Sequence, residues 1–195
     1  MDLTAMIRAA TQTLIDHVEE LTTLDQAIGD GDHGLNMKRG AEAIRAKLPE
    51  IGAKGFNDAL KTMGMTCMSV IGGSSGPVFG TLLVTLAKEL PAQPQGADLA
   101  RALAASIAAL TRLGKAEVGQ KTLLDVLDPV RQTLEVGGDG LVERVRQTAD
   151  DAATATATMQ AIKGRASFLG ERAYGHVDPG SRSMALIIGA ICDTL

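Results

Sequence analysis

Acidic residues gather in one short stretch of this 195-residue chain, residues 24–36, which reads LDQAIGDGDHGLN. The stretch contains three carboxylates, Asp25, Asp30 and Asp32. Like charges about 4 Å apart repel by ~1 kcal/mol per pair even in water, so the cluster needs a compensating cation. Interleaved glycines let the backbone turn sharply and bring the acids together. Because the stretch offers oxygen ligands and no cysteine, we predict that it holds a hard cation such as Mg²⁺ against the phosphates of a nucleotide.

Other interpretations fit the same letters. A GxGxxG spacing within the stretch matches the dinucleotide fingerprint, but that motif follows a buried strand, and the preceding segment here has a helical pattern. An EF-hand register that begins at Asp30 places Leu35 where the loop needs glycine and Ala41 where it needs glutamate. A turn between two helices, in which the aspartates cap backbone amides, stays open on spacing alone.

Residues 72–77, GGSSGP, form a second candidate site just before an apolar segment. Small residues and the hydroxyls of Ser74 and Ser75 would open a helix there. Free backbone amides and the helix dipole both favour an anion at such a position. The same letters equally fit an ordinary glycine turn with a serine N-cap and a proline in the first helical turn.

A third polar, glycine-rich region covers residues 164–180. Arg165 is a candidate for a two-pronged phosphate contact. His176 and Asp178 fit either ligand contacts or a turn, because Asp-Pro-Gly is a common turn sequence. Residues 114–122 nearly spell a P-loop, but an extra residue separates the glycine from the lysine and no strand precedes it. We therefore do not assign a P-loop.

Helical segments separate these candidate sites. Apolar residues recur at helical spacing from Leu3 to Leu21, and the acidic stretch follows. A second helix should stop at Pro49, and Gly114 is a natural C-cap. The further predicted helices cover residues 35–48, 56–70, 78–90, 97–113, 122–136 with a break near Pro129, 141–162 and 181–195. Neither alternating strands nor an internal repeat is evident.

The composition narrows the class of protein. The chain is long enough for one domain with a full core, and hydrophobic residues make up 45%. Aromatic residues are only 2%, so we expect a core of aliphatic side chains in closely packed helices. A net charge of -4 without a basic run argues against a nucleic-acid partner. The two cysteines, Cys67 and Cys192, predict buried thiols in a reducing compartment. Since we find no signal peptide and no membrane span, we expect a cytoplasmic location.

Four motifs together resemble one family. LDQAIGDGDHGLNMKRG, GGSSGPVFG, LGKAEVGQKTLLDVLDP and GRASFLGERAYGHVDPG occur in the order and spacing of the ADP-binding L subunit of dihydroxyacetone kinases. The same module forms a domain of single-chain, ATP-dependent dihydroxyacetone kinases and is related to one in fatty acid kinase. The resemblance covers nearly the whole chain. It implies one all-α domain over residues 1–195, a barrel-like bundle of about eight amphipathic helices with the nucleotide site in the loops at one end.

The resemblance also implies roles for individual residues. The implied Mg²⁺ ligands, for two ions, are Asp25, Asp30 and Asp32. The implied contacts with phosphates or the metal shell are His33, Asn36, Ser74 and Ser75. The implied contacts with the rest of the nucleotide, ADP or ATP, are Gly114, Leu123, Arg165, Asp178, Pro179 and Gly180. The family usually has methionine where this chain has Leu123, and leucine keeps an apolar contact.

The resemblance further implies a phosphotransferase that works in a complex. No residue here serves convincingly as a nucleophile or general base toward a substrate. In the family, a separate K subunit binds dihydroxyacetone through a histidine, and the L subunit transfers a phosphoryl group to give dihydroxyacetone phosphate. In phosphotransferase-dependent systems the L subunit keeps its ADP, and a phosphohistidine-carrying M subunit recharges it. We therefore expect activity only with a K subunit, whether or not the chain forms a homodimer.

Two alternatives stay open at this point. The phosphoryl donor can be a phosphotransferase protein or free ATP, and the substrate can be another small ketose, a tetrose or a sugar acid, since substrate choice lies with the partner. The chain could instead be a nucleotide-binding module that acts mainly on a transcription regulator.

Overall fold

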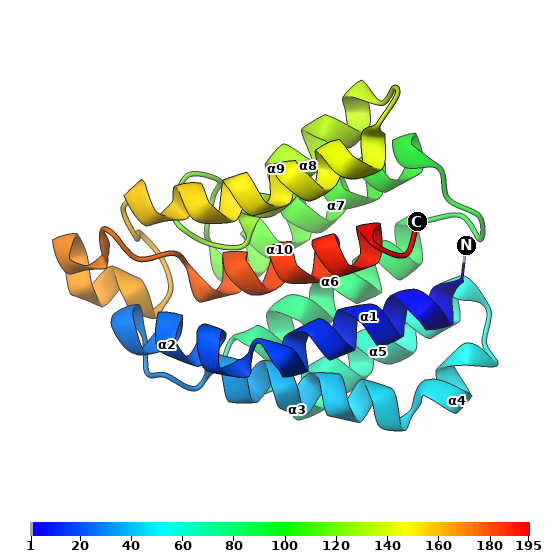
Figure 1. The fold of residues 1–195 in the computed structure, drawn as a ribbon, viewed down its shortest axis with the longest axis horizontal. Helices are drawn as coiled ribbons and strands as arrows, with labels where there is room; N and C mark the ends of the chain where they lie inside the picture. Colours follow the sequence, from blue (N-terminus) through cyan, green and yellow to red (C-terminus); the bar gives the residue numbers. More distant parts are fainter. Residues whose placement is uncertain (1) are drawn as a thin grey trace.

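A computed structural model describes residues 2–195, and these residues form helices and no strand (Figure 1). The predicted all-α class is confirmed. The α-helices are α1 (Leu3–Asp16), α2 (Val18–Ile28), α3 (His33–Ala46), α4 (Leu48–Gly52), α5 (Phe56–Val70), α6 (Ser75–Glu89), α7 (Gly96–Gly114), α8 (Leu124–Val136), α9 (Leu141–Ala155) and α10 (Pro179–Cys192). Two 3₁₀ helices, η1 (Thr156–Thr158) and η2 (Arg165–Ala173), lie between α9 and α10.

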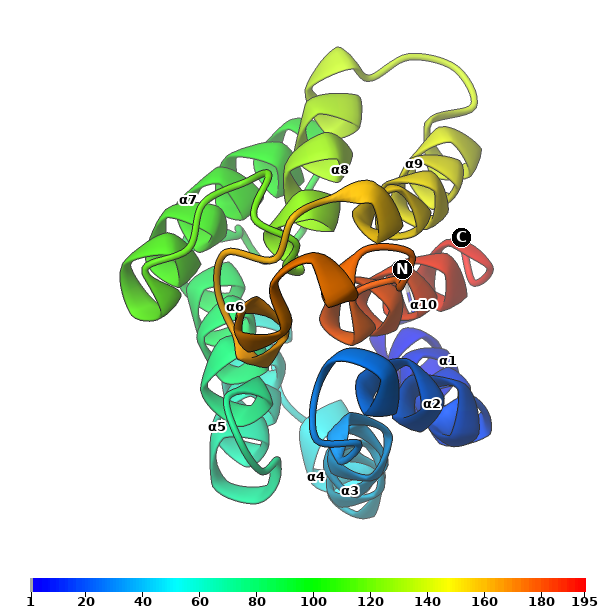
Figure 2. The same cartoon turned by 90° about the vertical axis from the view of Figure 1, so that its left-hand side faces the viewer.

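The long helices close into a barrel (Figure 2). α1 packs on α3 and α3 on α5. From α5 to α10 each helix packs on the next, and α10 returns to α1. α2 follows α1 after His17 alone, so the two extend along one wall (Figure 1). Because successive walls run in opposite directions, every second connection lies at the same end. Segments 29–32, 71–74, 115–123 and 156–178 are therefore neighbours in space although they are far apart in sequence.

Aliphatic side chains fill the barrel wall and its interior. Leu21, Ile51 and Leu127 are among the fully buried ones. Small residues let helices approach closely: a Cβ atom on Gly64 of α5 would lie 2.9 Å from the carbonyl oxygen of Gly80 in α6. This explains how a chain with so few aromatic residues still forms a packed core.

The burial of the cysteines agrees in part with the expectation of two buried thiols. Cys67 is buried and Cys192 is partly buried, and both are free thiols. Burial raises the pKa of the Cys67 thiol to about 12, which keeps it protonated and unreactive. Within residues 2–195, no helix is both long enough and apolar enough to cross a membrane.

Several predicted helix ends were wrong, and the cause is local chemistry. The first predicted helix is interrupted at His17, which separates α1 from α2. α3 ends before Pro49, which lies in the first turn of α4, where the missing N–H is harmless. Gly114 is the last residue of α7, and the left-handed cap is Lys115. α8 continues through Pro129, because one absent backbone donor does not outweigh the packing of its buried face.

The predicted helix over residues 141–162 is also too long, since α9 ends at Ala155. There the Thr156 hydroxyl donates to the carbonyl of Ala153 at 2.6 Å and accepts the N–H of Asp178 at 2.9 Å. The carbonyl of Thr156 accepts a hydrogen bond from the Lys121 ammonium. Tertiary hydrogen bonds thus replace the helical ones that would have continued α9.

Candidate functional site

The acidic stretch forms the tight connection between α2 and α3. Asp25 lies in the last turn of α2 and is buried. Its Oδ2 atom accepts the backbone N–H groups of Asp32 at 2.9 Å and His33 at 3.0 Å. Asp25 therefore caps the first turn of α3 from the preceding helix, which leaves the side chain of Asp32 free of any capping bond.

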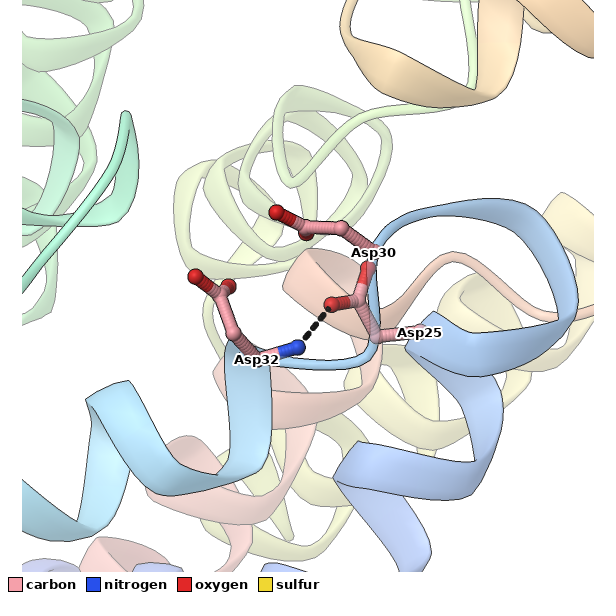
Figure 3. A group of neighbouring side chains, drawn as sticks. All are labelled: Asp25, Asp30 and Asp32. Atoms are coloured by element: carbon pink, nitrogen blue, oxygen red, sulfur yellow. Dashed lines mark hydrogen bonds between the residues drawn. The ribbon is translucent and has the colours of Figure 1, made fainter.

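The three carboxyl groups face a common space (Figure 3). One oxygen from each of Asp25, Asp30 and Asp32 lies within 4.8 Å of the others. Asp30 also forms an ion pair with Arg165 of η2, with Oδ2 and Nη1 2.6 Å apart. Carboxylate oxygens at this spacing suit a hard dication, which takes oxygen ligands at about 2.0–2.6 Å. The capping role left open from the sequence applies to Asp25, while Asp30 and Asp32 point toward a shared ligand position.

The GGSSGP segment lies opposite the acidic stretch, at the start of α6. Ser74 precedes the helix without capping it, so the first amides of α6 have no side-chain partner. Gly72 packs directly on Asn36: a Cβ atom there would lie 2.7 Å from Oδ1 of Asn36. A larger residue at position 72 would press on the Asn36 amide, so glycine lets the turn lie against α3.

His33 joins three walls of the barrel behind this site. Its Nδ1 lies 3.2 Å from the hydroxyl of Ser75 in α6, and its Nε2 lies 3.1 Å from the hydroxyl of Ser183 in α10. Burial lowers the pKa of His33, although the charges of Asp25 and Asp32 oppose the shift. The imidazole is therefore neutral at pH 7, and both of its nitrogens are used in holding helices together.

A hollow of about 300 Å³ opens between these segments. It collects every residue that the family resemblance assigns: Asp25, Asp30, Asp32, His33, Asn36, Ser74, Ser75, Gly114, Leu123, Arg165, Asp178, Pro179 and Gly180. His176 is exposed and does not line it. A larger, open hollow of about 980 Å³ lies at the opposite end, near Lys54 and Phe56, and none of these residues lines it. The chemistry is therefore concentrated at the end where four connections meet.

Residues 27–193 match the model of the DAK2 domain. This chain belongs to the DAK2 family. It is 42% identical over 178 residues to the ADP-binding subunit DhaL of the PEP-dependent dihydroxyacetone kinase of Escherichia coli, covering 87% of this chain and 85% of that protein. It is 40% identical over 177 residues to the ADP-binding subunit DhaL of PEP-dependent dihydroxyacetone kinase 1 of Listeria innocua, covering 89% of this chain and 86% of that protein. The resemblance inferred from the four motifs is confirmed.

A solved structure shares the fold of this DAK2 chain. The dihydroxyacetone kinase of C. freundii, crystallised with AMP-PNP and Mg²⁺, superposes with a TM-score of 0.81 at 22% identity. The match covers 99% of this chain and 34% of that longer chain. The helical barrel therefore occurs as one part of a larger kinase chain.

The DAK2 barrel also contains polar residues that the sequence analysis did not select. Asp125, at the start of α8, is buried, and its carboxylate accepts the N–H groups of Gly119 and of Thr122, the latter at 2.7 Å. Lys121, which directly precedes Thr122, is 1% exposed. The segment nearly matches a P-loop in sequence, but the spacing of apolar residues does not show whether a lysine such as Lys121 is buried or on the surface.

Asp178 is the N-cap of α10 and reaches into the same hollow. Its Oδ2 accepts the N–H of Ser181 at 2.7 Å. Burial raises the pKa of the Asp178 carboxyl to about 6, and the charge of Asp125 adds to this, whereas the hydrogen bonds from Ser181 and the charge of Lys121 oppose it. In this DAK2 chain the Asp178 carboxyl therefore keeps its proton to a higher pH than an ordinary aspartate.

The raised pKa of Asp178 predicts a pH dependence of stability that Asp178→Asn should remove. Because the folded-state pKa of about 6 exceeds the unfolded value of 3.8, the contribution of Asp178 is complete below about pH 4 and is lost as the pH rises through about 6. Asparagine also caps helices. We expect the free energy of unfolding of Asp178→Asn to rise relative to wild type between pH 4 and pH 7, measured by urea titration without nucleotide. If the difference in the free energy of unfolding between Asp178→Asn and wild type stayed the same from pH 4 to pH 7, the raised pKa of Asp178 would be wrong.

Proposed function

We propose that this chain is the ADP-binding subunit of a PEP-dependent dihydroxyacetone kinase. In this proposal it binds ADP with Mg²⁺, receives a phosphoryl group that originates from phosphoenolpyruvate, and passes it to dihydroxyacetone held on a partner K subunit. One observation carries the proposal: the acidic triad, the open start of α6 and Arg165 line one hollow. The E. coli and Listeria innocua relatives are named as subunits of PEP-dependent dihydroxyacetone kinases, and this chain covers most of their length. This supports dihydroxyacetone as the substrate and phosphoenolpyruvate as the donor.

The proposed roles follow from charge and position. Asp25, Asp30 and Asp32 would hold the metal, and three carboxylates carry more charge than one dication neutralises, which favours two ions. A metal held by these carboxylates would supply positive charge against the negative charge that develops on the phosphates during transfer. Ser74 and Ser75 line the hollow, and their backbone amides would take further phosphate charge.

Arg165 would exchange partners when nucleotide binds. Its ion pair with Asp30 is partly exposed, with side chains 62% and 36% accessible, so the pair contributes only about 0–1 kcal/mol. With Asp30 serving as a metal ligand, the guanidinium of Arg165 would be free to form a forked contact with phosphate. This exchange would couple the position of η2 to the occupancy of the site.

A partner is required because this chain supplies the phosphoryl group and not the acceptor. The histidine among the residues that line the hollow is His33, and both nitrogens of its imidazole ring already contact serine hydroxyls. It is therefore not free to bind an acceptor substrate. Phe168 in η2, close in sequence to Arg165, is 88% exposed, which suits a contact with the K subunit at this end of the barrel. The free cysteines support a reducing compartment, and we propose the cytoplasm.

Reconstitution tests this function. We expect the purified chain, mixed with its K and M subunits, the general phosphotransferase proteins, phosphoenolpyruvate and Mg²⁺, to form dihydroxyacetone phosphate from dihydroxyacetone. Omission of this chain should stop the reaction, and ATP should not replace phosphoenolpyruvate. ADP should remain with the protein through gel filtration, because a cofactor that is recharged in place need not dissociate. Equal rates with ATP and rapid loss of ADP would contradict the proposed donor.

A further inference from the structure

Lys121 is the largest fully buried side chain among the described residues, and its backbone is unusual. It is 1% exposed, and its φ of 63° is in the left-handed region that non-glycine residues rarely adopt. A left-handed lysine in a fully buried position is costly twice, once for the backbone and once for removing an ammonium from water. The surroundings must therefore compensate the ammonium well.

The compensation comes from three backbone carbonyls. The Nζ atom donates to the carbonyl oxygens of Thr156 at 2.8 Å, Ala173 at 2.8 Å and Met159 at 3.4 Å. All three partners are acceptors only, so the amine uses all three protons and is charged. Thr156 is the first residue of η1, Met159 directly follows η1, and Ala173 is the last residue of η2. One ammonium thus joins two separate parts of the connection between α9 and α10.

Building on the proposed function, we propose that Lys121 is a positioning residue of the nucleotide site, which holds segments 119–123, 156–159 and 173–178 in the arrangement that receives the nucleotide. Lys121 lines the hollow together with its neighbours Thr122 and Leu123. The carbonyl of Thr122 accepts the Ser181 hydroxyl at 2.9 Å, so the same segment also fixes the start of α10.

Further contacts support a joint role of these segments. The N–H of Gly175 donates to the carbonyl of Ala157 at 2.8 Å, and the N–H of Ile162 donates to the carbonyl of Gln120 at 3.3 Å. Asp178, which caps α10 in the hollow, donates its N–H to the Thr156 hydroxyl at 2.9 Å. The Lys121 ammonium is bonded to the carbonyl of that same threonine. Without it, the buried carbonyl of Ala173 would lose its donor, and the carbonyl of Thr156 would keep only the N–H of Met159, at the place where Asp178 is held.

Lys121 also influences the charge of Asp178. The positive charge of Lys121 lowers the pKa of Asp178, against the raising effects of burial and of Asp125. In return, the charge of Asp178 opposes the lowering of the Lys121 pKa by burial. Asp125, Lys121 and the hydrogen bonds of Ser181 are the groups that act on this carboxyl.

The test compares Lys121→Met with Lys121→Arg in Mg·ADP titrations by calorimetry, after removal of bound nucleotide with EDTA. Methionine has a similar volume but cannot donate, whereas arginine keeps the charge and the donors and is larger. If the ammonium positions the site, we expect the Kd for Mg·ADP to rise about tenfold or more in Lys121→Met, because the buried carbonyl of Ala173 would lose its donor and that of Thr156 would lose one of its two donors. Lys121→Arg should bind more tightly than Lys121→Met.

A role in filling volume alone predicts the opposite order, with methionine close to wild type and arginine worse, and that order would overturn the proposal. A second measurement is the Asp178 carboxyl pKa by ¹³C NMR, which should rise in Lys121→Met and stay near the wild-type value in Lys121→Arg. An unmoved pKa in Lys121→Met would contradict the electrostatic influence of Lys121 on Asp178.

Lys115→Met is the matched control. Lys115 is exposed, lies in the same connection and has a positive φ of 49°, so its replacement should leave the Kd unchanged.

If Lys121→Met does not show the circular dichroism of a folded barrel, Lys121→Gln takes its place, with an amide that donates fewer bonds and an expected Kd above wild type. A wild-type protein that does not bind Mg·ADP would defeat the proposed function, whereas tight binding by wild type and by Lys121→Met alike would defeat only the role of Lys121.

Discussion

Replacing Asp30 with alanine is expected to abolish Mg²⁺-dependent ADP binding while the far-UV circular dichroism stays that of the wild type. The three carboxyl oxygens lie within 4.8 Å of one another, so the loss of one removes charge and a ligand from the proposed metal site. Asp30 is partly exposed on a connection and supports no helix, so the fold should survive. We expect the Kd for ADP with Mg²⁺ to rise at least about a hundredfold, or about 3 kcal/mol, by calorimetry.

Asp32→Asn separates the metal site from the ion pair, because Asp30 also contacts Arg165. Within residues 2–195 we find no hydrogen bond or ion pair made by the Asp32 carboxylate, so its change to an amide should affect only the proposed metal. Asp139→Asn, on the exposed connection between α8 and α9, is the control and should bind as wild type does. If both site variants bound Mg·ADP with unchanged affinity, the metal assignment would be wrong.

Gly34→Ala is expected to have the largest effect on stability. Gly34 is the second residue of α3, where α3 crosses α2. A Cβ atom there would lie 2.3 Å from the carbonyl oxygen of Val18 and 2.8 Å from the backbone nitrogen of Thr22. Backbone atoms cannot move aside as a flexible side chain can, so α3 must shift away from α2. We expect the free energy of unfolding to fall by about 3 kcal/mol, measured by urea titration.

The shift should also weaken ADP binding, because α3 begins with His33 at the acidic stretch. Gly189→Ala in α10 is the matched control, since the same substitution there meets no heavy atom within 4 Å. Alanine is the better helix former, so the control should gain about 0.5–1 kcal/mol. Equal stabilities for the two variants would mean that α2 and α3 do not touch at Gly34.

Much of this molecule follows from local sequence patterns. Apolar residues at helical spacing predicted the helices, and the central residues of most helices are where we expected them. α5 begins at Phe56 as predicted, and α7 and α10 differ from the prediction only at their ends. The dense pattern of aspartate and glycine in residues 24–36 predicted a metal-binding turn, and the structure brings its three carboxylates together. Helical periodicity and turn motifs depend on residues that are close together along the chain, so a single sequence is enough to predict them.

Helix ends and the inner contacts of the site depended on the tertiary structure. α9 stops at Ala155 because Thr156 bonds to Asp178 and Lys121, which lie far away in sequence. Pro129 should have broken a helix by local rules, yet α8 continues because one face of it is buried. Propensity decides a helix end only where nothing distant competes for the same carbonyls and amides.

The sequence by itself determined that this chain forms helices, that they have apolar faces to bury, and that its acidic and glycine-rich motifs lie in the connections. The folded barrel alone decided that Asp25 caps α3, that His33 joins α6 and α10, and that Lys121 is buried among three carbonyls. The physical reason is the closure of the ring. Antiparallel walls place every second connection at one end, and there groups as far apart in sequence as His33 and Ser183 come within hydrogen-bonding distance.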